Sequence, residues 1–123
     1  MNELLIHKTK NTLEVNFKAN GNLELSGSSF PENATEFFTP TINWIKQYML
    51  EITGKIVFNL KFDYVNSSSI KYISDIIDKL QNYHTGGGEV EINWYYDEND
   101  EDIQEMGEDL KEDVDFTFNL IMK

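Results

Sequence analysis

The chain has 123 residues and contains no cysteine, which excludes disulfide bonds, thiolate nucleophiles and cysteine metal sites. It also has no apolar run that approaches the roughly 20 residues needed to cross a bilayer. Its first residues, MNELLIH, lack the basic flank and the apolar core of a signal peptide. We therefore expect a cytoplasmic protein.

Basic side chains are scarce in this chain. It has 10 Lys and Arg residues against 22 Asp and Glu residues, and its formal net charge is -12. Nucleic acid and anionic membrane surfaces would repel such a chain, so we expect protein partners, no nucleic acid and no membrane. The length suits one hydrophobic core, and residues 1–123 are expected to form a single domain without a linker or an internal repeat.

Hydrophobic periodicity predicts the order of the secondary structure. Apolar and polar residues alternate over residues 13–17 and 23–26, and the Asn-Gly-Asn turn between them predicts an N-terminal β-hairpin. Three helices and three strands are predicted in alternation after it. The helices span residues 34–52, 68–84 and 102–112, and the strands span residues 55–62, 89–94 and 116–121. This order predicts an α/β fold with a mixed β-sheet and crossover helices.

Pro40 lies within the first predicted helix. Proline lacks the backbone N–H group, and its ring clashes with the preceding helical turn. We therefore expect either a kink at Pro40 or two shorter helices that meet near residue 39.

Residues 62–71 (FDYVNSSSIK) place three adjacent hydroxyl groups where a buried strand passes into an amphipathic helix. The first turn of a helix has free N–H groups and the positive end of the helix dipole, so a phosphate attached there would be stabilised. Two interpretations are open. Either Asn66 or Ser67 simply caps the helix, or the junction is phosphorylated and acts as a switch.

Residues 97–108 (DENDEDIQEMGE) partly match a calcium-binding loop. Carboxylate or amide groups stand at the first, third, fifth and twelfth positions, but the sixth position, which needs glycine, is Asp102. The other interpretation is a solvated acidic start of a helix, with Asp100, Glu101 and Asp102 near the positive end of its dipole. A small acidic ligand-binding or metal-binding domain that uses this segment is the alternative function.

Enzymatic chemistry has little support in the sequence. His7 and His84 are isolated, and no glycine-flanked elbow surrounds Ser67, so no catalytic triad is predicted. Ser67 as a catalytic nucleophile is a third hypothesis. We expect no catalytic residues, no cofactor and no metal site.

Three separated motifs resemble the SiaC-like regulatory phosphoprotein family, small bacterial proteins whose architecture is related to the anti-sigma factor antagonists of the STAS class. Residues 26–38 (SGSSFPENATEFF) form the first motif and residues 62–71 the second. The third is residues 93–102 (NWYYDENDED), followed by Gly107-Glu108. Together the motifs cover nearly the whole chain in the same order. The resemblance implies a STAS-like fold.

The same resemblance implies a non-enzymatic bacterial signalling switch. A SiaB-like serine/threonine kinase would phosphorylate a hydroxyl at the strand–helix junction, and a PP2C-like phosphatase would remove the phosphate. The unphosphorylated form would bind and activate a GGDEF diguanylate cyclase or another signalling output protein, which links the switch to cyclic-di-GMP and biofilm formation. The family's acceptor falls on Ser67, with Ser68 as its rival. The residues expected around the phosphate are Tyr64, Asn66, Ser69 and Lys71.

The helix predicted at residues 34–52 carries a second aromatic stripe, formed by Phe37, Trp44 and Tyr48. A helix that is apolar on two faces is usually buried, so these side chains could complete the core. Alternatively, part of the stripe is exposed beside the serine junction and binds a partner, because Trp and Tyr are favoured at interface hot spots. The three residues are the candidate partner surface.

Overall fold

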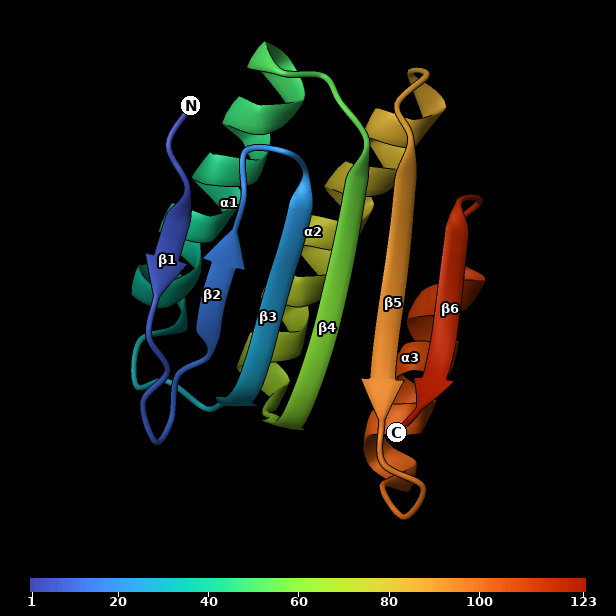
Figure 1. The fold of residues 1–123 in the computed structure, drawn as a ribbon. Helices are drawn as coiled ribbons and strands as arrows, with labels where there is room; N and C mark the ends of the chain where they lie inside the picture. The colour runs from blue at the N-terminus through green and yellow to red at the C-terminus, as the bar shows by residue number, and fades with distance from the viewer.

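Six β-strands lie side by side in the order in which they occur in the chain, and three helices cover one face of the sheet (Figure 1). The computed structural model describes residues 1–123. The strands are β1 (Leu4–Ile6), β2 (Glu14–Phe17), β3 (Asn22–Ser29), β4 (Ile56–Val65), β5 (Val90–Tyr96) and β6 (Thr117–Met122). The helices are α1 (Ala34–Glu51), α2 (Ser67–Thr85) and α3 (Glu101–Glu112).

The sheet is mixed, as the sequence predicts. β1, β2 and β3 pair antiparallel, whereas β3, β4, β5 and β6 are parallel and are connected through one helix each. The predicted hairpin is formed by β2 and β3, and Gly21 N–H donates to Lys18 O at 3.0 Å in its turn. β1 was not predicted, because three residues are too few to show an alternation. It pairs with β2 from Leu4↔Phe17 to Ile6↔Val15.

All three helices begin at the carboxyl edge of the parallel strands, which is the lower edge of the sheet in Figure 1. A side chain caps each helix there by accepting a hydrogen bond from a backbone N–H group two or three residues into the helix. The caps are Asn33, Asn66 and Asp100. In open α/β sheets this edge is where functional sites usually lie.

The helix-covered face of the sheet carries the core, and the other face is polar and has no helix over it (Figure 1). A chain of amide hydrogen bonds runs across the uncovered face. Asn119 donates to Asn93 at 3.0 Å, Asn93 to Asn59 at 3.0 Å, and Asn59 to Asn22 at 3.1 Å. On the same face Lys61 lies 2.9 Å from Glu24, and this hydrogen bond raises the pKa of Lys61.

α1 is one unbroken helix from Ala34 to Glu51, although it contains Pro40. The division expected near residue 39 is therefore wrong. Proline leaves the carbonyl of Glu36 without its usual N–H partner. Both Glu36 and Pro40 are exposed, so water can reach that carbonyl. None of the three helices combines the length and the hydropathy that would let it span a bilayer.

α3 approaches the sheet closely at Gly107. The indole N–H of Trp94, which is fully buried, donates to Ile103 O at 2.9 Å. A Cβ atom at Gly107 would lie 2.5 Å from Trp94 Cδ1 and 2.8 Å from Leu120 Cδ2. Neither neighbour is a flexible surface side chain, so the helix itself would have to move away from the sheet.

We expect Gly107→Ala to lower the free energy of unfolding by about 2 kcal/mol. Overpacking a core costs about 1–3 kcal/mol, and the close approach at Gly107 favours a cost near the upper limit of this range. Alanine has a better helix propensity than glycine, which offsets about 1 kcal/mol of that cost. Urea denaturation followed by tryptophan fluorescence measures it. Gly86→Ala is the control, because its Cβ would have no neighbour closer than 3.6 Å. Equal stability of the two variants would contradict the close packing of α3.

Candidate functional site

The junction between β4 and α2 is held by Asn66. Its side-chain oxygen accepts hydrogen bonds from Ser69 N–H at 2.9 Å and from Ser68 Oγ at 3.2 Å. Its own N–H donates to Ser29 O at 2.9 Å, which joins the start of α2 to the end of β3. Of the two residues considered as caps, Asn66 therefore has this role, and Ser67 is the first residue of the helix.

The three adjacent serines differ in accessibility and in bonding. Ser67 and Ser68 are exposed, whereas Ser69 is fully buried. Ser68 donates to the cap, and Ser67 Oγ makes no hydrogen bond to the protein. Ser67 therefore carries the free hydroxyl group at the N-terminus of α2. Lys71 is exposed one turn further along the helix, on the same side as Ser67.

Ser69 belongs to a buried pair with Ser29, a residue that is not among those predicted around the junction. Ser29 Oγ donates to Ser69 Oγ at 2.7 Å, and Ser69 Oγ donates to Ser29 O at 3.3 Å. Both side chains are completely buried. The alternation of β3 puts Leu23 and Leu25 on the core side, and the same period of two, extended to the end of the strand, predicts that Ser29 is buried. The pair ties the first turn of α2 to β3.

β4 contains a bulge directly before the junction. Gly27 pairs with Phe62, but Ser28 pairs with Tyr64, so Asp63 is an extra residue in β4. Gly27 has a φ of 103°, a conformation that favours glycine. The inward positions of β4 follow a period of two as far as Phe62, and then Val65 is buried instead of Tyr64. Tyr64 is therefore turned outward, and 53% of it is exposed.

The aromatic stripe on α1 lies mostly in the core, which corrects its interpretation as a partner surface. Trp44 is only 8% exposed, and its indole N–H donates to Asn2 O at 2.8 Å. Tyr48 is 1% exposed, its hydroxyl donates to Lys55 O at 2.9 Å, and burial raises the pKa of this phenol. Phe37 is half-buried and packs edge-on against Phe38. The alternative interpretation, that these aromatic residues complete the core, is the correct one for Trp44 and Tyr48.

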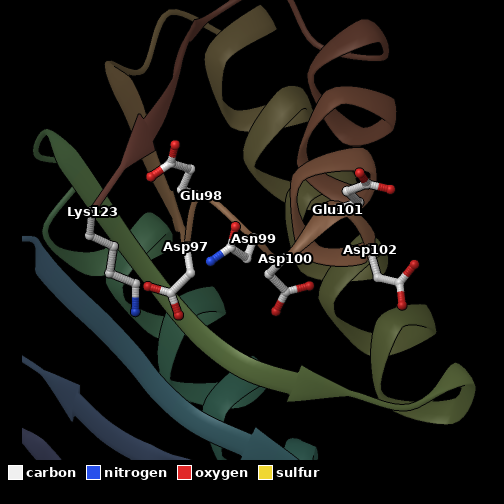
Figure 2. Close-up of a pocket in the computed structure, with 7 residues that line it drawn as sticks. All are labelled: Asp97, Glu98, Asn99, Asp100, Glu101, Asp102 and Lys123. Atoms are coloured by element: carbon white, nitrogen blue, oxygen red, sulfur yellow. The ribbon is translucent and has the colours of Figure 1, made fainter.

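The acidic segment at residues 97–102 lines an open cavity of about 690 Å3 at the same edge of the sheet (Figure 2). α3 begins at Glu101, so most of the stretch compared with a calcium loop is helical, and that interpretation is wrong. Figure 2 shows the carboxylates of Glu98, Asp100 and Asp102 pointing in different directions rather than to one point. No group of three or more His, Cys, Asp or Glu side chains is arranged to hold a metal ion. The segment is the capped acidic start of a helix.

Comparison with known proteins gives the same assignment as the three motifs. A model described as SiaC family regulatory phosphoprotein matches residues 6–123. The chain belongs to the SiaC family. An uncharacterized protein of Pseudomonas aeruginosa is 35% identical to it over 120 residues, which are 96% of this chain and 94% of that protein. The expected family is confirmed.

Solved structures of SiaC family proteins confirm the fold. SiaC of Pseudomonas aeruginosa superimposes with a TM-score of 0.94 and 32% sequence identity over the whole of both chains. A second structure contains the diguanylate cyclase SiaD of Pseudomonas aeruginosa in complex with its activator SiaC. It matches with a TM-score of 0.93 and 33% identity, over 98% of this chain and 99% of that one. The family is one of regulatory phosphoproteins by its description.

The buried serine pair predicts an unequal mutational response. Ser69→Ala removes the acceptor of the buried Ser29 hydroxyl and should cost about 1–3 kcal/mol of stability. Adding Ser29→Ala to the Ser69→Ala variant should cost little further stability, because it removes the Ser29 hydroxyl that the first substitution left without an acceptor. Urea denaturation of the two single variants and the double variant measures the coupling. Costs that add to within about 0.5 kcal/mol would contradict the pairing.

Proposed function

We propose that this protein is a non-enzymatic signalling switch controlled by reversible phosphorylation of Ser67. A SiaB-like serine/threonine kinase adds the phosphate, and a PP2C-like phosphatase removes it. The unphosphorylated form binds and activates a GGDEF diguanylate cyclase in the cytoplasm. The observation that supports this proposal best is the exposed, unbonded hydroxyl of Ser67 at the N-terminus of α2, in a chain of the SiaC family.

The local electrostatics suit a phosphate at Ser67. Asn66 already accepts from Ser69 N–H, but the N–H groups of Ser67 and Ser68 have no partner within the helix. A phosphate there would accept hydrogen bonds from these groups and would lie at the positive end of the dipole of α2. Lys71, one turn along, adds a cation on the same side of the helix. These contacts stabilise the phosphorylated state without a change of fold.

Among the three serines, burial and bonding favour Ser67 as the acceptor. Ser69 is buried and hydrogen-bonded to Ser29, so a kinase cannot reach it without opening the start of the helix. Ser68 is exposed and is the rival acceptor, but its hydroxyl is engaged with the cap. Ser67 is free of both constraints.

The effect on a partner follows from charge and size. A phosphate adds a charge of about -1.5 to -2 where the unmodified protein presents a small neutral hydroxyl. A partner surface that fits the hydroxyl would have to desolvate this dianion in order to bind. A penalty of about 3 kcal/mol is enough to weaken the affinity by roughly 100-fold. The complex of the relative SiaC with the cyclase SiaD supports a diguanylate cyclase as the partner.

The test combines mass spectrometry with a binding measurement. After incubation with ATP and the purified SiaB-like kinase of the same organism, we expect one phosphate, located on Ser67. Ser67→Ala should accept none, and Ser68→Ala, the matched control, should still be phosphorylated. Because Asn66 is the cap, Ser67→Ala should change the stability by less than about 0.5 kcal/mol. Phosphate found only on Ser68 would contradict the acceptor assignment.

The same preparations test the switch. Calorimetric titration with the purified diguanylate cyclase of the same organism should give equal affinities for the wild type and for Ser67→Ala. The phosphorylated protein should bind at least about 100-fold more weakly. Equal affinity of the phosphorylated protein and Ser67→Ala would refute the switch.

A further inference from the structure

The bulge at Asp63 places an aromatic side chain on the surface beside the serine junction. If β4 continued its period of two past Phe62, Tyr64 would enter the core and Val65 would face outward. The extra residue reverses this, so that Val65 is 3% exposed and Tyr64 is 53% exposed. Bulges beside functional sites commonly redirect a side chain in this way.

Tyr64 has an exposed aromatic neighbour. Phe30 follows the end of β3 and is 38% exposed, and the two rings meet edge-on with centroids 5.9 Å apart. No other large aromatic side chain is exposed, and the exposed leucine and isoleucine side chains lie on β1 and at the far end of α1. They are Leu5, Leu50 and Ile52. The Phe30–Tyr64 pair is therefore the aromatic surface next to Ser67.

The other side of Tyr64 borders a cavity of about 330 Å3 between the end of β4 and α3. Val65, Ile103 and Met106 contribute apolar surface to it. Five carboxylate side chains and no cationic side chain surround this apolar floor. They are Asp63, Asp100, Asp102, Glu105 and Asp109. A partner that fits this cavity presents an apolar side chain flanked by lysine or arginine residues.

We infer that the Phe30–Tyr64 pair and the adjoining acidic cavity form the docking surface for a basic region of the kinase that phosphorylates Ser67. This inference rests on the proposed function. The cavity is lined by Tyr64 and Val65, the two residues before the cap Asn66, so a protein seated in it is held next to the acceptor hydroxyl. Holding the reacting groups together in this way raises the efficiency of the transfer.

Charge favours the kinase over the output protein as the occupant. A partner held by cations at this surface would be attracted more strongly after Ser67 gained a phosphate, so phosphorylation could not release it. In the kinase the new phosphate faces the phosphates of ADP, and their repulsion assists release. In the transfer, Ser67 Oγ forms a bond to the γ-phosphorus of ATP while the bond from this phosphorus to the bridging oxygen breaks. The bridging oxygen keeps the electron pair and departs with ADP, and the hydroxyl proton passes to the catalytic base of the kinase.

Steady-state phosphorylation of single variants by the purified SiaB-like kinase of the same organism tests the aromatic part. Tyr64→Ala should raise KM at least tenfold and leave kcat within twofold, because docking is lost and the acceptor is intact. Tyr64→Phe is the matched control and should behave as the wild type. Equal melting temperatures of the three proteins show that the fold is unchanged. An unchanged KM for Tyr64→Ala, or a loss confined to kcat, would overturn the inference.

A pair of double variants tests the charged part. Glu105→Lys/Asp109→Lys reverses two exposed charges that line the cavity, four residues apart on α3. Glu108→Lys/Glu112→Lys makes the same change in net charge with the same spacing, at exposed positions outside the cavity. We expect kcat/KM to fall at least tenfold for the first variant and less than twofold for the second. For the wild type, kcat/KM should also fall as salt is added. Equal losses in the two variants would show only a general charge effect and would overturn the inference.

Binding to the purified diguanylate cyclase distinguishes the remaining outcomes. If Tyr64→Ala binds the cyclase at least tenfold more weakly and is phosphorylated normally, the surface belongs to the output protein and the inference is wrong. If the kinase adds no phosphate even to the wild type, the proposed function itself fails. Normal cyclase binding together with a raised KM for the kinase supports the docking surface.

Discussion

The pairing of β3 with β4 controls the geometry of the serine junction. Ser29 is the last residue of β3, and its carbonyl accepts hydrogen bonds from Asn66 N–H and from Ser69 Oγ. Its own hydroxyl donates to Ser69 Oγ. These bonds set the position of the first turn of α2, and with it the direction in which Ser67 points. The bulge at Asp63 is part of the same pairing. A shift of one residue between these strands would bury Tyr64, expose Val65 and separate the buried serines.

Much of this fold follows from local sequence rules. Alternation located the hairpin and the parallel strands, and helical periodicity located all three helices to within a few residues. The serine junction was found because three hydroxyls stand between a strand pattern and a helix pattern. β1 was missed because its three residues are a strand only through pairing with β2. Pro40 was expected to kink α1 or to divide it; α1 is not divided, and the residue whose carbonyl loses its N–H partner, Glu36, is exposed to water.

The remaining differences depend on tertiary contacts that no local pattern records. Whether Trp44 on α1 is buried or exposed depends on the N-terminal segment, because the carbonyl of Asn2 accepts the hydrogen bond of its indole N–H. The bulge is invisible in the sequence of β4 alone, because only the register with β3 shows that Asp63 is extra. For the same reason, the outward position of Tyr64 and its contact with Phe30 could not be predicted, although both residues lie in the recognised motifs.

The amide chain across the uncovered face of the sheet has a consequence for a member of a family of regulatory phosphoproteins. None of its members, from Asn119 to Asn22, can take up or release a proton. The amide hydrogen bonds between these four parallel strands therefore contain no group that titrates, unlike the Lys61–Glu24 pair on the same face. The amide chain is thus an uncharged link across the sheet, which the phosphate proposed at Ser67 would leave unchanged.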